Sequence, residues 1–396
     1  MVKGKYISAL DIGTSKVIAL IGEVQEDNEI HIVGLGQAPS RGLKAGMVTN
    51  IDATAQAIKQ AMNEAELMAD CKVDSVTTGI AGNHIRSLNS QGVVKIKDGE
   101  VSQADIDRAI ETAKAVNIPP DHNILHTVVQ EYIIDNQPGV KEPIGMSGVR
   151  LDTRVHIITG AITALQNIQK CVNRCGLHME QIMLQPLASG QAVLTEDEKD
   201  LGVCVIDIGG GTTDIAVLSL GGKVKATSVR MAGNHYDDEI LKHVRNKFSI
   251  AIGQRTAEQL KKNVACCPQK ADFDETMEVK GRSLLTGLPI KVNVSTSDLY
   301  EPVMMLSEQI GTAAHQVLEK TPPELAGDIF RNGVVLTGGG AQLHGLPEYL
   351  SQELKVDVTV SPDPVNCVAL GTAMSLGLND KLETGFLDAT PRMGRR

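Results

Sequence analysis

The side chains best suited to chemistry form two short segments with one pattern. In the first, Asp11 stands before Gly13, Thr14, Ser15 and Lys16. In the second, Asp207 stands before Gly209, Gly210, Gly211, Thr212 and Thr213. Glycine lets backbone N–H groups converge on an anion such as phosphate, because no Cβ is in the way. An aspartate would repel phosphate, so its expected partner is Mg²⁺, bound mainly through water, while Lys16 can contact phosphate.

The two segments form an internal repeat, one copy in each half of the chain. Each follows an apolar strand, turns through glycine and continues into a second apolar stretch, over residues 17–21 and 215–220. This pattern is typical of a β-hairpin. A single copy could be an ordinary turn, in which Asp and Gly are common. The matched pair predicts two related domains that each supply a phosphate loop.

A third candidate loop is formed by Gly338, Gly339 and Gly340, between an expected strand and an expected helix. Backbone N–H groups and the helix dipole favour a polar part of a ligand there. A Rossmann interpretation fails because the sixth position of the motif is Leu343 instead of glycine. The chain also has no G-x-x-x-x-G-K-[ST] motif, which excludes a P-loop. Glu258 and Lys261 share a helix face at i, i+3, where an ordinary surface salt bridge is equally consistent with the sequence.

Composition limits the classes of protein that remain. The chain has a net charge of −10, with 22% charged residues. Nucleic acid is bound by a strongly basic surface, so we expect no nucleic-acid partner. The seven cysteines are odd in number and complete no zinc set, which favours a reducing, cytoplasmic compartment. No apolar run reaches about 18 residues, and the N-terminus lacks a signal-peptide core, so we expect no membrane span.

The elements that must position these loops alternate between strands and helices, which predicts an α/β protein. The pattern of expected strands and helices changes over residues 84–162, which predicts a small inserted α+β subdomain. In it, Ser102 and Asp105 are expected to form a capping box at the start of a helix. Thr163 is expected to cap the helix that follows.

In the second half, Ser297 is expected to cap a long helix that ends near Glu319 and is stopped by Pro322 and Pro323. Residues 380–396 are expected to form a tail.

The order of these segments resembles that of actin, Hsp70 and the sugar kinases. The resemblance implies an actin-like two-domain ATPase fold of duplicated ribonuclease H-like domains, with ATP and Mg²⁺ between them. It identifies 11–16 and 207–214 as phosphate loops, 336–341 as the adenosine loop, and 188–190 with 369–371 as hinge helices. It places ribose and adenine contacts at Glu258 and Lys261. Further nucleotide contacts are assigned to Gly233, Asn234 and Lys262.

Within that superfamily the chain resembles the FtsA family of bacterial cell-division proteins, in residues 40–52 and 82–92. The resemblance covers essentially the whole chain and includes the insert. It implies a first actin-like domain (1–83, 163–190 and 366–396), the inserted subdomain (84–162), a second actin-like domain (191–240 and 305–365) and a small subdomain (241–304).

Two features depart from the family pattern. Gln185 stands before Pro186 where filament-forming and chaperone relatives commonly have Glu, and a neutral amide cannot act as a general base. Gln181, expected on a hinge helix, is the other candidate for positioning water, so we expect at most slow ATP hydrolysis. The family carries a terminal amphipathic membrane helix, whereas residues 384–396 hold too few large apolar residues to form its membrane-binding face. Either that helix lies beyond this sequence or this member lacks it.

The resemblance implies a cytoplasmic adaptor on the inner face of the membrane at the division site. It would polymerise with itself, bind the C-terminal peptide of the tubulin-like protein FtsZ, contact other divisome proteins and reach the membrane through the helix absent from this chain. The alternative is an actin-like scaffold of pilus assembly or a rod-shape filament, which shares the nucleotide loops. A metabolic kinase would need an aspartate base for its substrate hydroxyl, and the sequence shows no such signature.

Overall fold

The computed structural model describes residues 5–25, 30–82, 84–195, 198, 202–219, 222–267 and 272–377. The expected tail, 380–396, and with it the segment 384–396, lies outside the described residues. Among the residues that are described, no helix is both long enough and apolar enough to cross a bilayer.

The internal repeat builds two five-stranded sheets with the same topology. In each sheet three consecutive strands form an antiparallel meander, and two later strands continue in parallel beside its first strand. The first sheet has the order β11 (His178–Leu184), β6 (Ser75–Ile80), β1 (Lys5–Ile12), β2 (Lys16–Val24) and β3 (Ile30–Pro39). The second has the order β14 (Gly222–Val229), β13 (Thr213–Ser219), β12 (Val203–Ile208), β18 (Val334–Thr337) and β19 (Val358–Val360). The predicted duplication is therefore confirmed in the strand order.

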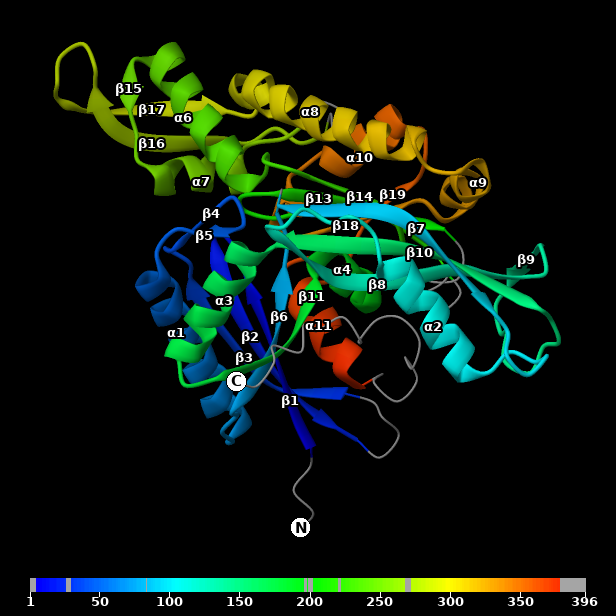
Figure 1. The fold of residues 1–396 in the computed structure, drawn as a ribbon. Helices are drawn as coiled ribbons and strands as arrows, with labels where there is room; N and C mark the ends of the chain where they lie inside the picture. The colour runs from blue at the N-terminus through cyan, green and yellow to red at the C-terminus, as the bar shows by residue number, and fades with distance from the viewer. Residues whose placement is uncertain are drawn as a thin grey trace.

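Helices cover the outer face of each sheet, giving the two lobes seen one above the other in Figure 1. The lower lobe in that view carries α1 (Ile51–Ala69) and α3 (Ile162–Arg174). The upper lobe carries α8 (Tyr300–Glu319), α9 (Pro323–Asn332) and α10 (Leu346–Leu354). The short strands β4 (Leu43–Lys44) and β5 (Met47–Val48) form a hairpin at the top of the lower lobe.

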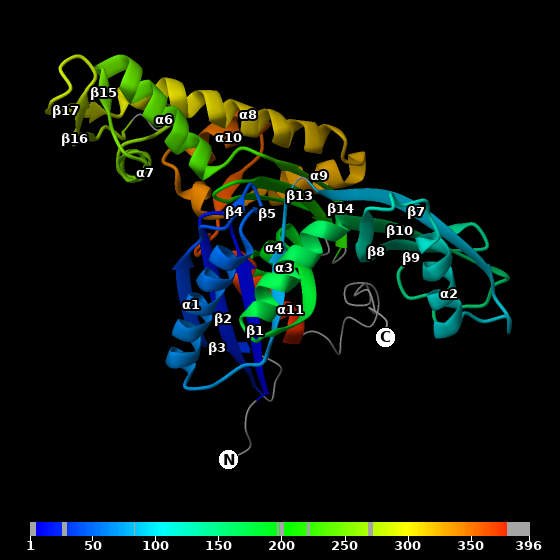
Figure 2. The same ribbon diagram turned by 60° about the vertical axis from the view of Figure 1, so that its left-hand side comes forward.

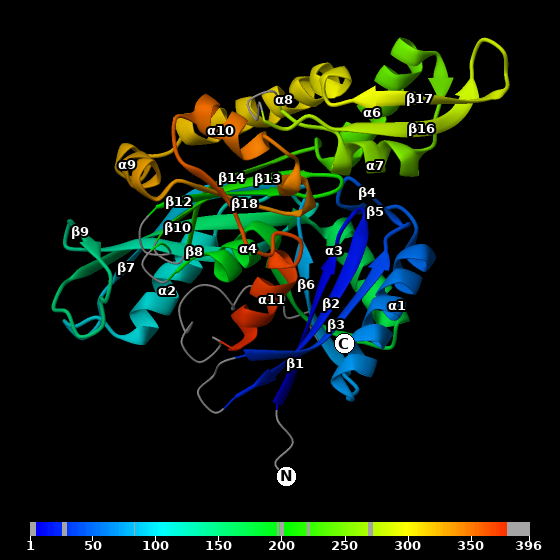
Figure 3. The same cartoon turned by 180° about the vertical axis from the view of Figure 1, so that it is seen from behind.

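Two helices cross between the sheets and join the lobes, α4 (Gln185–Val193) and α11 (Cys367–Gly377). The view from behind in Figure 3 shows α11 below α4. They carry the segments 188–190 and 369–371 that were expected to form the hinge helices. The two backbones are so close at Gly371 that a Cβ there would overlap the carbonyl oxygen of Ala188. Only glycine permits this crossing without a shift of one helix.

The inserted subdomain extends from the side of the molecule (Figures 1 and 2). Its antiparallel sheet has the order β7 (Ile85–Lys95), β10 (Arg150–Ala161), β8 (His122–Ile134) and β9 (Gln137–Val140). Helix α2 (Gln103–Lys114) packs against β7 and β10. The predicted α+β insert is confirmed.

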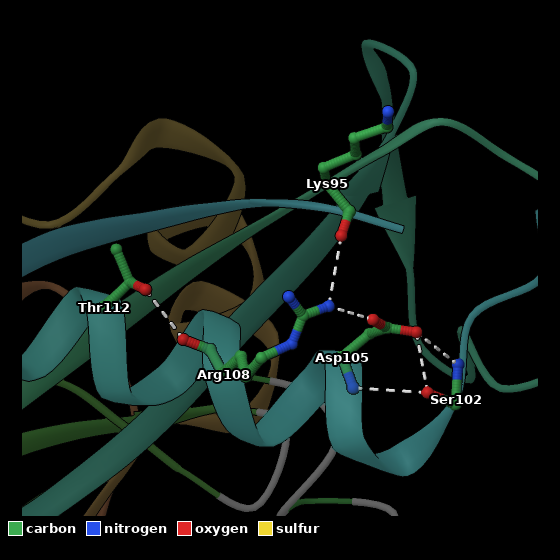
Figure 4. Close-up of polar contacts among 5 residues, drawn as sticks. All are labelled: Lys95, Ser102, Asp105, Arg108 and Thr112. Atoms are coloured by element: carbon green, nitrogen blue, oxygen red, sulfur yellow. Dashed lines mark hydrogen bonds and ion pairs between the residues drawn. The ribbon is translucent and has the colours of Figure 1, made fainter. Parts of the chain in front are cut away.

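The predicted capping box at the start of α2 is also present (Figure 4). The Oγ of Ser102 accepts a hydrogen bond from the backbone N–H of Asp105, and Asp105 accepts one from the backbone N–H of Ser102. Arg108 donates both to Asp105 and to the carbonyl oxygen of Lys95, which ties the helix to β7. The hydrogen bonds from Ser102, followed by Arg108, lower the pKa of Asp105 to about 2.

A second small subdomain stands on the upper lobe, at the left of Figure 1. It consists of α6 (Gly233–Phe248), α7 (Gln254–Asn263) and a three-stranded sheet of β15 (Ile250–Ala251), β16 (Thr276–Ser283) and β17 (Pro289–Ser295). A short 3₁₀ turn, η1 (Ser297–Leu299), leads from it into α8. The boundaries of the four subdomains stay a prediction.

Two predicted helix starts were wrong, whereas the predicted end of α8 at Glu319, shortly before Pro322 and Pro323, is confirmed. Thr163 is not a cap, because α3 begins at Ile162 directly after β10 and Thr163 already lies in its first turn. Ser297 lies inside η1, and the cap-like hydrogen bonds run from the backbone N–H and Oγ of Ser295 to Asp298. Pro322 and Pro323 follow the end of α8 but also begin α9, since proline is well tolerated at the first position of a helix.

The helix crossing gives a first prediction. Gly371→Ala should lower the free energy of unfolding by about 3 kcal/mol or more, because an added methyl group without space costs that much when backbone must move. Gly327→Ala is the matched control, since this glycine lies in α9 with no atom within 4 Å of an added Cβ. The control should be neutral or stabilising. Urea denaturation of both variants decides this, and equal stability would contradict the proposed close crossing.

Candidate functional site

A cavity of about 930 Å³ lies between the two lobes. It is lined by segments from both sheets, from α7 and from the loop after β18. Of the residues predicted from the sequence, the cavity brings together Asp11, Gly13, Thr14, Ser15, Lys16, Gln185, Asp207, Gly209, Gly210, Gly211, Thr212, Gly233, Asn234, Glu258, Lys261, Lys262, Gly338, Gly339 and Gly340. Two predicted residues are not among its lining, Gln181 and Thr213.

The two glycine loops have the same local geometry. In the first, the N–H of Gly13 donates to the carbonyl oxygen of Lys16 at 3.0 Å; in the second, that of Gly209 donates to Thr212 at 2.9 Å. Each bond closes a tight turn at the end of a central strand, so the sequence repeat is a repeat of structure. The loops face each other so closely that a Cβ on Gly210 would overlap the side chain of Ser15.

The first turn of α6 holds the second loop in place. The N–H groups of Gly233 and Asn234 donate to the carbonyl oxygens of Gly209 and Gly210 at 3.0 and 2.8 Å. The side chain of Asn234 also accepts a hydrogen bond from the Oγ of Ser15, at 3.1 Å, and thereby links the second lobe to the first loop. Gly233 therefore contacts the second loop, and Asn234 contacts both loops.

Two buried carboxylates lie at the heads of the loops. Asp11 accepts a hydrogen bond from Nε2 of Gln185 at 2.7 Å, and Asp207 accepts one from Oγ of Ser189 at 2.9 Å. Burial, together with the neighbouring Asp207, raises the pKa of Asp11 to about 7, and burial raises that of Asp207 to about 6. The raised pKa values mean that ionising both carboxyls is costly at this buried place. A cation bound between them would lower that cost.

The donor set indicates which cation fits. Among the described residues no group of three or more His, Cys, Asp or Glu side chains could enclose a metal ion. A hard cation that keeps most of its water and uses one or two carboxylates, as Mg²⁺ does, matches the pair Asp11 and Asp207. The nearby ammonium of Lys16 lowers the pKa of both carboxyls, while its own pKa is lowered, primarily by burial.

Helix α7 and the third glycine loop form a further part of the cavity wall. Lys261 donates to the carboxylate of Asp237 and to the carbonyl oxygen of Gly233, both at 2.9 Å, so it already braces the first turn of α6. Glu258 is paired with Lys262 at 2.6 Å. The pair Glu258 and Lys261 expected at i, i+3 is therefore not formed, because each residue has another partner, while both side chains line the cavity. Their contact with a ribose or a base stays a prediction.

The third loop requires glycine at its first position. Gly338 has φ of +79°, and a Cβ there would lie within 2.5 Å of the carboxylate of Asp207. The 3₁₀ turn η2 (Gly339–Gln342) follows at once. Gly338 thus lets this loop pass directly against Asp207, at the head of the second glycine loop.

Sequence reasoning missed several residues of the cavity wall. His344 lines it, and its ring stacks on Phe273 with the centroids 4.2 Å apart. Gly79 lies at the end of β6, the strand parallel to β1, and lines the cavity beside the first loop. The end of a parallel strand is where α/β proteins bind ligands, so the strand assignment contained a signal for Gly79. No sequence signal pointed to His344.

The two predicted residues outside the lining have structural explanations. Gln181 lies on strand β11 instead of a hinge helix, so the expectation about its element was wrong. Gln185, the other glutamine predicted to position water, lines the cavity. Thr213 is fully buried, and its Oγ1 donates to the carbonyl oxygen of Met231 at 2.5 Å, which fixes the chain that leads into α6.

Comparison with known proteins agrees with this architecture. Residues 82–159 match the family model described as the SHS2 domain inserted in FTSA, and residues 161–384 match the model of the MreB/Mbl protein. The chain is 56% identical over 381 residues to the cell division protein FtsA of Neisseria meningitidis serogroup B, covering 96% of this chain and 87% of that protein. It is 38% identical over 371 residues to the cell division protein FtsA of Escherichia coli K12, covering 92% and 86%.

The chain belongs to the FtsA family of cell-division proteins. The resemblance that rested on residues 40–52 and 82–92 is confirmed. An identity of 56% over nearly the whole chain, together with the match of the insert to the FTSA-specific model, favours this family over the pilus and rod-shape alternatives, although residues 161–384 also match the MreB/Mbl model.

Solved structures place this FtsA-family chain in the actin-like fold that was predicted. MreB5 of Spiroplasma citri bound to ADP has a TM-score of 0.64 at 22% identity, covering 96% of this chain and 99% of that one. The PilM-PilN type IV pilus biogenesis complex has a TM-score of 0.62 at 17% identity, covering 94% and 98%. At such identities these similarities establish the fold alone.

The buried carboxylates predict an unusual dependence of stability on pH. Because the folded chain binds a proton at Asp11 more tightly than the unfolded chain does, the free energy of unfolding should decrease as pH rises from about 4 to about 7 in the absence of metal. Asp11→Asn removes this ionisation and keeps an oxygen that can accept from Gln185.

The variant should therefore melt higher than the wild type at pH 8 in EDTA, by at least the roughly 2–4 °C that 1 kcal/mol produces in domains of 150–250 residues. The gain should disappear near pH 4. Asp98→Asn, at an exposed position, is the control and should change neither value. A variant no more stable than wild type at pH 8 would show that the ionised pair carries no cost.

Proposed function

We propose that this FtsA-family protein binds Mg·ATP in the cavity between its lobes and uses it to control self-association and attachment of the FtsZ ring to the membrane. The observation that carries the nucleotide part is the pair of facing glycine loops, each with a buried aspartate at its head. Two tight turns supply backbone N–H groups for a polyphosphate, and the two carboxylates supply the partners of its cation.

The polyphosphate would lie between Gly13–Lys16 and Gly209–Thr212, with Lys16 as its ammonium contact. The base and ribose would lie toward α7 and Gly338–Gly340, where Glu258 and Lys261 border the cavity. MreB5 of Spiroplasma citri, which shares the fold, binds ADP in one solved structure and AMPPNP in another. Those structures support a nucleotide as the occupant of the corresponding cavity here.

Mg²⁺, when bound, neutralises the phosphate oxygens beside the carboxylates. Asp11 and Asp207 would hold it through water, because their carboxyls are already oriented by Gln185 and Ser189. A bound cation would offset the burial and the repulsion from Asp207 that raise the pKa of Asp11. Nucleotide and cation are therefore expected to bind together and to draw the two lobes onto each other.

Hydrolysis is proposed to be slow. Gln185 is the side chain best placed to touch a water near the phosphates, but its Nε2 donates to Asp11 and an amide has no basic group at neutral pH. A site that binds ATP tightly and hydrolyses it slowly suits a protein in which bound nucleotide sets a conformation. The angle between the lobes would then determine affinity for neighbouring copies in a filament.

The partners follow from family membership. We propose that the small subdomain, 241–304, binds the C-terminal peptide of FtsZ and that filaments recruit later divisome proteins. The protein would be cytoplasmic and peripheral on the inner face of the membrane at the division site, held by a C-terminal amphipathic helix outside this sequence. An identity of 56% to a cell division protein FtsA supports this role.

Calorimetry tests the nucleotide and FtsZ parts separately. The wild type should bind Mg·ATP, and Asp207→Ala should weaken binding at least tenfold, because it removes one of two cation partners. A C-terminal FtsZ peptide should bind both proteins, since 241–304 does not include Asp207. Absence of ATP binding in the wild type would overturn the nucleotide site, and ATP binding without peptide binding would overturn the FtsZ adaptor.

Gln185→Glu tests the cause of slow hydrolysis. A carboxylate at this position could accept a proton from water, and general-base catalysis is typically worth about 10²–10⁴-fold, so at least a tenfold rise in phosphate release is expected. Gln181→Glu is the matched control on strand β11, outside the cavity lining, and should leave the rate unchanged. A rise in the Gln181 variant, or none in the Gln185 variant, would overturn this assignment.

A further inference from the structure

A second cavity of about 490 Å³ lies where the inserted subdomain meets the upper lobe. Residues 85–87 of β7 line it from one side, and residues 226–228 of β14 with the end of α8 line it from the other. In Figures 1 and 2, β7 runs beside β14, and the two strands are in contact. The cavity therefore spans two parts of the molecule that belong to different subdomains.

Both strands are the edges of their sheets. β7 ends the four-stranded sheet of the insert, and β14 ends the five-stranded sheet of the upper lobe. An edge strand presents N–H and C=O groups on its free side, which an extended peptide can use. In addition, the Oγ of Ser228 is buried and has no hydrogen-bond partner within the described part of the chain. The wall of this cavity thus offers the Oγ of Ser228 and the backbone groups of an edge strand as hydrogen-bonding partners for a ligand.

The charge around the cavity is positive. Arg86 and the exposed Lys320 at the end of α8 both line the cavity. Asp214 is the acidic residue in its lining, but this side chain is only 6% exposed and already interacts within the chain. The two exposed cations favour a segment that carries carboxylates.

We propose that this cavity binds an extended acidic segment of a partner protein, which pairs with the edge of β14 and places carboxylates beside Arg86 and Lys320. An extended conformation matches the spacing of backbone groups on the edge strand, whereas a helix has already used its own backbone groups. The site lies apart from 241–304, so its partner differs from the FtsZ peptide proposed for that subdomain.

The cavity is joined to the first cavity through one short segment. Leu184 and Pro186 line the second cavity, while Gln185 between them lines the first and donates to Asp11. The N–H of Leu184 also donates to Nε2 of His126 on β8, so the insert holds this segment directly. A peptide that shifts the insert against β14 would therefore move Gln185, and this coupling rests on the proposed nucleotide function.

Peptide display on the immobilised full chain tests the site without assuming a partner. From a random heptapeptide library, the wild type should enrich sequences rich in Asp or Glu together with β-branched residues. The best peptide, synthesised with a fluorophore, should bind the double variant Arg86→Glu, Lys320→Glu at least tenfold more weakly. The double variant Lys95→Glu, Lys170→Glu makes the same change in charge at exposed positions outside the cavity lining and should bind like wild type.

Three outcomes would overturn the proposal. They are no enrichment of acidic peptides, equal binding to both double variants, and competition by the FtsZ C-terminal peptide. Hydrogen exchange adds a structural readout, because pairing must slow exchange at those backbone amides of residues 226–228 that point away from β13. A peptide that binds without this protection would also overturn it.

Calorimetry with Mg·ATP separates the two proposals. The double variant Arg86→Glu, Lys320→Glu should bind Mg·ATP like the wild type, which also shows that it is folded. If the wild type binds the acidic peptide but no ATP, the nucleotide function fails and the peptide site stands. If it binds both, the affinity for the peptide should change at least twofold on adding Mg·ATP, and an unchanged affinity would overturn the coupling through Gln185.

Discussion

Asp11 and Asp207 lie buried at the heads of two facing loops, and the negative charge that they carry has to be balanced inside the protein. Burial raises the pKa of both carboxyls, which favours binding of protons. A cation bound beside them would instead favour the ionised carboxylates. The two aspartates come from opposite lobes. We propose that a cation between them balances this charge and draws the lobes together.

The two lobes are joined by a pair of helices that cross each other. Helices α4 and α11 cross at Gly371, where the backbones touch and a larger residue has no space. The hydrogen bond from Gln185 to Asp11 attaches the start of α4 to the first loop. A change at the phosphate end is thus transmitted to the helix crossing, and through Leu184 and Pro186 to the base of the inserted subdomain.

Much of the cavity could be predicted because its chemistry is local in sequence. Asp11 with the glycine turn after it, and its repeat at Asp207, contain both the anion-binding backbone and the cation partner within a few residues. The wall contributed by His344 could not be predicted, because its neighbour Phe273 is distant in sequence. Gln181 was placed on the wrong element for a related reason: a short stretch of mixed polar and apolar residues does not distinguish a strand from a helix.

The sequence by itself determined the duplicated loops, the helix and strand order and the family, since these depend on residue type and spacing along the chain. Only the tertiary structure decided which side chains face one another. It brought Gly210 against Ser15, directed Gln185 toward the first aspartate, and set the free edges of β7 and β14 beside one cavity. These contacts join residues far apart in the chain, and their geometry depends on how two sheets and an insert pack, which no local pattern encodes.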